Sequence, residues 1–240
     1  CYNLTGSPVC GPNVTSMYYT YIYCNKLTGS PVCGDKVTSM YNAYYNCRNL
    51  TGNPVCGNNV KDMGHTYHNC YNLTGNPVCG DNVTNMYNAY YNCRNLTGSP
   101  VCGNNVKDMR YTYSGCNKLT GSPVCGNNVT NMSSTYYNCS NLTGPGVCGH
   151  NVTNMYNAYR NCTNITSGEI GIKVTTAVNT FYNCINLKTV TVYANTPPRI
   201  SNNTFKNCSK LIAIYVPNSN IDTYKSADNW SNYASIMQGF

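Results

Sequence analysis

"LTGSPVCGNNVTNMSSTYYNCSNLTG", residues 119–144, contains a pattern that the chain repeats almost unchanged on both sides. Each full copy has 23 residues and reads C-x-x-L-T-G-x-P-V-C-G-x-x-V-x-x-M-x-x-x-Y-x-x, with one departure at Pro145 and Gly146. A fixed period of this length is typical of a solenoid, in which each unit buries its apolar side chains only against its neighbours. We number repeat positions from the opening cysteine, which is position 1.

The opening cysteines divide the chain into units. The predicted parts are seven equal units in 1–161, a shorter unit 162–183, a longer unit 184–207, a last strand 208–216 and a C-terminal cap 217–240. The solenoid therefore spans residues 1–216. In the cap, Trp230 and Tyr233 are available to cover the apolar end of the stack, which a terminal coil requires.

Composition favours a folded rod. Only 9% of the residues are charged and 20 are glycine, but 41% are apolar and recur at fixed positions, which argues against disorder. No run of about 18 apolar residues is present, so we expect no membrane insertion in this segment. The chain starts inside a repeat and reads as a fragment, so any signal or anchor is expected outside it.

Stacked coils bring equivalent residues to roughly 4.8 Å, so identical side chains form rows along the rod. Five apolar rows are the predicted core. They are Leu4 to Leu142, continued by Ile165, Leu187 and Leu211; Val9 to Val147; Val14 to Val152; Met17 to Met155; and Tyr21 to Tyr159, continued by Phe181 and Phe205.

The segments between turn residues predict short parallel strands at "LT" and "VTNM". One helical or 3₁₀ turn is expected at "MYNAYYNC", where Met and Tyr are four apart. Pro8 and its equivalents cannot donate to a ladder, so "GSPVCG" is placed at a bend or edge, with the following glycine in a left-handed conformation. The predicted fold is a β-rich solenoid rod of about ten coils of 22–24 residues, about 45 to 50 Å long.

Units such as "NVTNMYNAYYNCRNLTG" resemble the BspA-like leucine-rich repeats of bacterial surface proteins, and "NTFKNCSKL" near the C-terminus matches their core still more closely. The resemblance covers the whole chain. It implies secreted or surface-displayed proteins, often of host-associated microbes, that bind proteins or cells and have no catalytic residues; similar repeats occur in tail-fibre-like proteins of bacterial viruses. One departure concerns strand length, because the family's second strand leucine is replaced. The replacing residues are Ser7, Ser30, Asn53, Asn76, Ser99, Ser122 and Pro145.

Seventeen cysteines form two sets: ten open the units and seven stand at position 10. Within one coil the two cysteines are nine residues apart, which exceeds the roughly 7 Å limit for bridging unless the chain folds back. Two interpretations stay open: two buried thiol rows, or strained disulfides between like cysteines of adjacent coils. Zinc has little support, because no C-x-x-C or paired-histidine spacing is present.

No catalytic constellation stands out. His65 and His68 share one unit, but they are two ligands short of a metal site. No glycine-rich phosphate loop, nucleophile elbow or triad spacing is present. The sequence therefore predicts a protein that is not an enzyme and has no cofactor or metal.

The net charge of +8 suggests affinity for acidic partners. The basic residues are spread along the whole chain and the aromatic residues are at core offsets, so no nucleic acid partner is predicted. A mild preference for acidic surfaces or glycans is the more modest inference.

Differences among the units gather at positions 2, 18, 19 and 22. These residues flank the core Met and Tyr rows, so we expect them to face solvent on one side. Their chemistry is typical of a binding surface. The alternative is that these surface positions vary without functional constraint, and that their tyrosines only stack between adjacent coils. The candidate contact residues are Tyr18, Tyr41, His65, His68, Tyr87, Arg110, Tyr111, Tyr156 and Arg160. By the same reasoning, Ser133 and Ser134 occupy places where packing makes no demand.

Two function classes follow. The first is an extracellular or cell-surface binding module, an adhesin or receptor-binding rod, whose partner is a protein or glycan on a host or bacterial surface. The second is a structural spacer, surface stalk or tail-fibre-like segment without its own ligand. Clustered variation favours the first class, and the near-identity of seven units favours the second.

Overall fold

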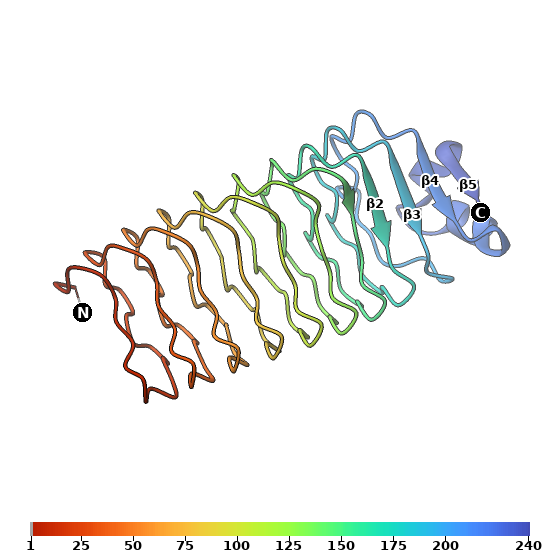
Figure 1. The fold of residues 1–240 in the computed structure, drawn as a ribbon. Helices are drawn as coiled ribbons and strands as arrows, with labels where there is room; N and C mark the ends of the chain where they lie inside the picture. The colour runs from red at the N-terminus through yellow and green to blue at the C-terminus, as the bar shows by residue number, and fades with distance from the viewer. Residues whose placement is uncertain (1) are drawn as a thin grey trace.

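The computed structural model describes residues 2–240, so the predicted opening cysteine Cys1 lies outside the described residues. The chain winds into coils that stack along one axis, with its two ends at opposite ends of the stack (Figure 1). This arrangement confirms the predicted leucine-rich-repeat solenoid.

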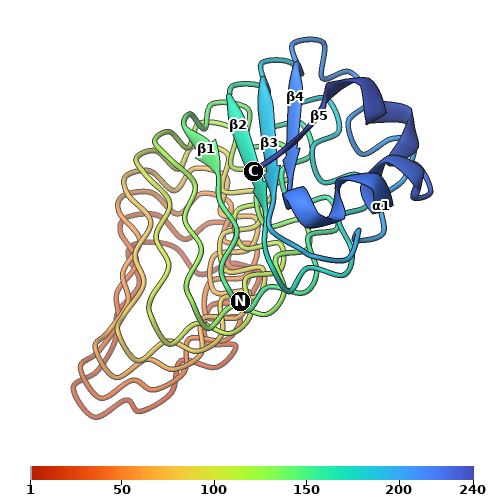
Figure 2. The same ribbon diagram turned by 90° about the vertical axis from the view of Figure 1, so that its right-hand side faces the viewer.

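Regular strands occur in the C-terminal part of the stack, where they form one parallel sheet in the order β1-β2-β3-β4-β5 (Figure 2). The strands are β1 Pro145–Gly146, β2 Ser167–Ile170, β3 Thr189–Val192, β4 Ala213–Val216 and β5 Met237–Gly239. Between β4 and β5 lie the 3₁₀ helix η1 Asn218–Asn220, the α-helix α1 Ile221–Ser226 and the 3₁₀ helix η2 Ser231–Ile236.

In the described part of the first six units, the coils are joined without named strands. Single parallel bridges link position 16 of one coil to position 16 of the next, as in Ser39 with Asp62. In addition, backbone N–H groups between positions 17 and 23 donate to backbone carbonyls of the next coil. Position 8, which corresponds to the β2 strand region, is proline in these units. Because proline has no N–H to donate, the ladder cannot form there.

Core tyrosines replace the missing ladder. The Tyr113 hydroxyl accepts a hydrogen bond from the Val101 N–H at 3.1 Å and donates one to the Val101 carbonyl at 2.7 Å. The same clamp recurs in the other units with Pro-Val. In the units that contain β2 and β3, the core aromatics are Phe181 and Phe205, which have no hydroxyl. The unit with the two-residue strand β1 is intermediate, because the Tyr159 hydroxyl still donates to the Val147 carbonyl at 2.6 Å.

The prediction that Val9 to Val147 form a buried row is wrong. Val9 is 76% exposed, and its equivalents are half-buried. The preceding prolines, such as Pro100 and Pro123, are buried instead. The tyrosine clamp holds the valine by its backbone, so its side chain is not required in the core.

The other four predicted rows form the core. Their Leu, Val, Met and Tyr side chains are fully buried in the inner coils, and the stacked tyrosine rings are 5.3 to 5.6 Å apart. At the ends, Leu4 and Val14 are partly exposed and Leu211 is half-buried. A further row, not predicted, has Ala or Thr at position 20 and is buried from Ala43 on; the Thr66 hydroxyl lies within hydrogen-bond distance of the carbonyls of both Met40 and Met63, at 2.9 and 2.8 Å.

The predicted helical turn at "MYNAYYNC" is replaced by isolated hydrogen-bonded turns. In the third unit, the Thr66 N–H donates to the Met63 carbonyl and the Cys70 N–H to the Tyr67 carbonyl. His65 and Asn69 have positive φ, which ends any helix at once. The left-handed glycine is also not the predicted one: Gly52, before the proline, has φ +80°, whereas Gly57 after the cysteine is absent from the positive-φ residues.

All sixteen cysteines in residues 2–240 are free thiols. The opening row is buried, and from Cys47 on each thiol donates to a backbone carbonyl one turn of the solenoid earlier, as Cys47 does to Tyr21 at 2.9 Å. Burial raises the pKa of the Cys47 thiol to about 12. The position-10 row is only half-buried, so one of the two predicted buried thiol rows is confirmed and the other is not.

Candidate functional site: an aromatic face

The variable positions 18, 19 and 22 form one face of the rod, which we call the aromatic face. Along it, Tyr18 stacks on Tyr41 at 5.4 Å, Tyr41 meets His65 edge-on at 5.6 Å, and His65 meets Tyr87 edge-on at 4.9 Å. Tyr111 continues the row at 6.3 Å from Tyr87. The structure therefore brings five candidate residues from five successive coils into one continuous row.

A second row runs beside the first. The His68 ring lies between Tyr45 and Tyr91, 4.6 Å from each and nearly parallel to both. His65 lies 5.5 Å from His68 and joins the two rows. Tyr45 and Tyr91 were not among the predicted candidates, although they share repeat position 22 with His68.

The candidate contact residues differ in how far their side chains are exposed. Tyr18 is 60% exposed and Tyr156 42% exposed, but Tyr41, His65, His68 and the others are half-buried against their neighbours. The expectation that the whole set faces solvent is therefore only partly correct. Each ring has an exposed edge, while part of its area contacts the adjacent coil.

Backbone conformation at position 19 is left-handed in all of the 23-residue units. Four of these positions carry residues other than asparagine: Tyr19, His65, Tyr111 and Ser134, with φ between 54° and 57°. The other three carry asparagine, which adopts this region at lower cost than most residues. Aromatic side chains thus stand at a position where the repeat's own asparagine would be less strained.

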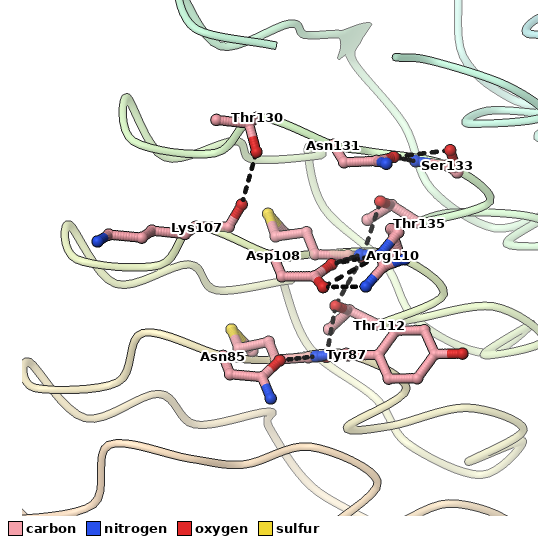
Figure 3. Close-up of polar contacts among 12 residues, drawn as sticks. Asn85, Tyr87, Lys107, Asp108, Arg110, Thr112, Thr130, Asn131, Ser133 and Thr135 are labelled. Atoms are coloured by element: carbon pink, nitrogen blue, oxygen red, sulfur yellow. Dashed lines mark hydrogen bonds and ion pairs between the residues drawn. The ribbon is translucent and has the colours of Figure 1, made fainter. Parts of the chain in front are cut away.

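Arg110 is held in place on the aromatic face (Figure 3). Its guanidinium makes a two-pronged contact with Asp108, in which the shortest N–O distance is 2.6 Å, and lies 4.8 Å from the Tyr87 ring centre. Both interactions restrict the side chain. Arg110 therefore presents an oriented cation whose side chain remains 43% exposed.

The sixth unit interrupts the aromatic row. Ser133 and Ser134 are both buried, and the Ser133 hydroxyl donates to Asn131, as Figure 3 shows for this pair. The prediction that packing makes no demand at these two serines is wrong. Beyond the gap, Arg160 lies 4.1 Å from the Tyr182 ring centre, separate from the five-coil row.

Burial keeps the two histidines neutral. The pKa of His68 is lowered to about 4, chiefly by burial and then by His65, and burial also lowers the pKa of His65. The Nδ1 atoms of both rings are buried without a hydrogen-bond partner. The rings therefore act as aromatic surfaces at neutral pH, not as cations.

We expect stability to fall as pH drops through the window from 6.5 to about 4. Within it the unfolded chain binds a proton at His68 that the folded chain does not, so the stabilisation is complete above 6.5 and is lost below. Urea midpoints at pH 7 and pH 5 measure this difference. His68→Tyr, which copies Tyr45 and Tyr91, should shrink it; an equal difference in the variant would contradict the assignment.

Other chemistry is limited in the part of the chain that the structure describes. No group of three or more His, Cys, Asp or Glu side chains in residues 2–240 is placed to hold a metal ion. None of the described helices is long and apolar enough to span a bilayer. The arrangement offers contact area and hydrogen bonding, and the interactions described above are all non-covalent.

The chain is similar to two solved structures. The first is a leucine rich cell surface protein of Faecalibacterium prausnitzii A2-165; it is 16% identical, the match covers 93% of this chain and 72% of that one, and the TM-score is 0.36. The second is a leucine-rich repeat protein of Bacteroides ovatus ATCC 8483; it is 13% identical, the match covers 98% of this chain and 91% of that one, and the TM-score is 0.28. No curated protein matches the chain.

The family model of the BspA type leucine rich repeat region matches residues 16–143 and 132–236. The match confirms the resemblance predicted from the repeat pattern. Because these residues make up most of the chain, this protein belongs to the BspA-type leucine-rich repeat family.

Proposed function

We propose that this protein is a non-catalytic binding module of a cell surface or extracellular structure, and that the aromatic face is its contact surface. Its partner would be a protein or glycan on a host or bacterial surface. Leucine-rich repeat domains generally mediate protein binding, and the resemblance to surface-displayed proteins supports the location. The candidate residues Tyr18, Tyr41, His65, Tyr87 and Tyr111 supply the continuous part of this surface.

The observation that carries the proposal is the left-handed backbone at the aromatic residues Tyr19, His65 and Tyr111, which is strained for the two tyrosines. A left-handed conformation costs most residues other than glycine about 1 kcal/mol or more, and such strain gathers at functional sites. The same chain uses asparagine at the equivalent Asn42 and Asn88. An aromatic ring at this position is explained if its exposed edge contacts a partner.

The test replaces Tyr19, His65 and Tyr111 together with asparagine. Strain is relieved while stacking worth about 0.5 to 1.5 kcal/mol per aromatic pair is lost, so we expect the stability to change little. Binding of the labelled protein to intact epithelial cells and intact bacteria, measured by flow cytometry, should fall to background. The reciprocal variant, with tyrosine at the half-buried Asn157, should bind at least as well as the original protein. Unchanged binding by the asparagine variant, together with lower stability, would mean that the rings serve stacking alone.

A second function, a structural spacer, is favoured by a different observation. The aromatic side chains pack partly against the next coil, as His68 does against Tyr45 and Tyr91, and backbone hydrogen bonds join every described coil to its neighbour. A rod built in this way holds its ends apart without a ligand. Under this alternative, a surface stalk or tail-fibre-like segment, the folded protein would bind to neither kind of cell.

A further inference from the structure

The excess of positive over negative charge falls at one corner of the repeat. Every unit turns a corner at its opening cysteine, and eight basic residues lie from two residues before to four residues after such a cysteine. They are Lys26, Arg48, Arg94, Lys118, Lys188, Lys206 and Lys210, together with Arg160, which at position 22 also belongs to the aromatic face. None of the seven acidic residues falls in this window. The other seven basic residues balance the seven acidic ones, so the whole net charge of +8 resides on this corner, which we call the basic edge.

The sequence suggested charges spread along the chain, but the stacking of the coils aligns them. Contacts between equivalent positions show this: the Lys118 ammonium donates to Asn95 and the Lys210 ammonium to Asn186, each in the preceding coil. Seven of the eight basic residues are exposed; Arg160 is half-buried. Within residues 2–240 the one ion pair joins Arg110 and Asp108, away from this edge, so no carboxylate neutralises it.

In the middle of the basic edge, Tyr71 lies between two arginines. Arg48 lies 5.6 Å from the ring centre of Tyr71 and Arg94 lies 5.0 Å from it, and they come from the coils before and after. Both faces of the ring are thus taken by a guanidinium. The two cations are spaced two coils apart and are held in a fixed orientation.

A polar hollow lies next to Arg94. It has a volume of about 410 Å³ and is lined by side chains of four successive coils, among them Arg94, Asn117, Ser140 and Thr163. Its floor is made by Gly115, which interrupts a row of asparagines at position 23.

The interruption leaves amide groups free. Elsewhere in the row three links are present, in which an asparagine amide donates to the side-chain oxygen of the asparagine before: Asn69 to Asn46 at 2.7 Å, Asn92 to Asn69 at 3.1 Å and Asn161 to Asn138 at 2.6 Å. At Gly115 the link is missing, so the hydrogen-bond pattern of the described residues gives Asn92 Oδ1 no donor and Asn138 Nδ2 no acceptor. The hollow therefore offers one acceptor, one donor and a cation to an incoming polar group.

We propose that the basic edge binds a linear acidic polysaccharide, with one sugar unit seated in the hollow beside Gly115. Cations aligned on stacked coils suit a polymer whose negative charge also recurs at regular intervals. Hydroxyl groups need paired donors and acceptors, which Asn92, Asn138, Ser140 and Thr163 provide.

Other anionic partners fit this edge less well. Single-stranded nucleic acid requires free aromatic faces on which bases stack, but both faces of Tyr71 are covered by Arg48 and Arg94. A folded acidic protein requires an apolar anchor at the centre of its contact, and the hollow is lined by polar side chains and glycine. An anionic bilayer offers a plane of charge, whereas these residues follow a line.

The test measures binding of the whole chain to polygalacturonate, a linear polymer with a carboxylate on each sugar, by biolayer interferometry. The edge variant is Arg48→Asn, Arg94→Asn and Lys118→Asn, because asparagine already occurs at both repeat positions, as in Asn25 and Asn95. The control variant, Lys36→Asn, Lys61→Thr and Lys107→Thr, loses the same charge elsewhere and also uses residues found at those positions. We expect about a tenfold or greater loss of affinity in the edge variant and less than about twofold in the control.

Gly115→Asn tests the hollow without changing charge. Asparagine adopts the left-handed conformation at Asn92 and Asn138; its Cβ would meet Asn92 Oδ1, but this is the end of a flexible side chain and can shift, so the variant should fold and complete the amide row. We expect its affinity for polygalacturonate to fall several-fold; unchanged affinity would remove the hollow from the site.

Three results would overturn the proposal: no binding to polygalacturonate, equal losses in the edge and control variants, or tighter binding to poly(dT) or to phosphatidylglycerol vesicles. Neutral dextran should not bind. The asparagine variant of the aromatic face retains all basic-edge residues and should bind polygalacturonate normally. Failure here is therefore distinguishable from failure of the proposed function.

Discussion

Tyr113→Phe should destabilise the protein by about 2 to 4 kcal/mol, because one hydroxyl serves both the N–H and the carbonyl of Val101. The proline before this valine prevents pairing with a neighbouring strand, so no backbone group stands ready to replace the hydroxyl. The ring itself would stay stacked between Tyr90 and Tyr136. The loss is thus confined to the two hydrogen bonds.

Urea denaturation followed by far-ultraviolet circular dichroism measures this effect. Tyr137→Phe is the matched control, since its hydroxyl makes no hydrogen bond in the described structure and the residue is only half-buried; its midpoint should not move. Phe181→Tyr provides the converse test. In that unit β2 and β3 pair directly, so a new hydroxyl would be buried without a partner and should destabilise. Equal midpoints for Tyr113→Phe and the original protein would contradict the clamp.

Most of the solenoid could be predicted because the period fixes which residues lie above one another. Leu119, Val129, Met132 and Tyr136 were assigned to the core from spacing alone, and all four are fully buried. The valine row failed because apolar character does not reveal a backbone held by a side-chain hydroxyl. The change from tyrosine to Phe181 was visible in the sequence and was the available signal.

The candidate site was less predictable than the fold. Repeat variation predicted that these residues share one side of the rod, and Tyr41, His65 and Tyr87 do lie in one row. It did not reveal the left-handed backbone, which depends on coil-to-coil hydrogen bonding. Arg48 and Arg94 were missed as a group because charges that are distant along the chain meet only when the coils are stacked.

The C-terminal end of the stack should depend strongly on Trp230, the single tryptophan, which is 1% exposed. Its indole N–H donates to the Pro198 carbonyl at 2.8 Å, and its ring meets Tyr224 and Phe205 edge-on at 5.1 and 6.1 Å. These contacts join residues 217–240 to the last coils, which supports their proposed role as a cap.

Trp230→Ala removes a large buried ring and leaves a buried carbonyl unpaired, so we expect a loss of about 3 to 5 kcal/mol. Because a solenoid is stabilised by contacts between neighbours, the loss should be concentrated in the coils nearest the cap. Hydrogen exchange resolved by segment measures this: protection should fall around β3 and β4 and persist around Tyr67 and Tyr90. Trp230→Phe, which retains most of the ring, should lose less stability.

Deleting residues 217–240 should expose the apolar end of the core and cause aggregation. A deletion variant that stayed monomeric, or an even loss of protection along the whole rod, would contradict the cap.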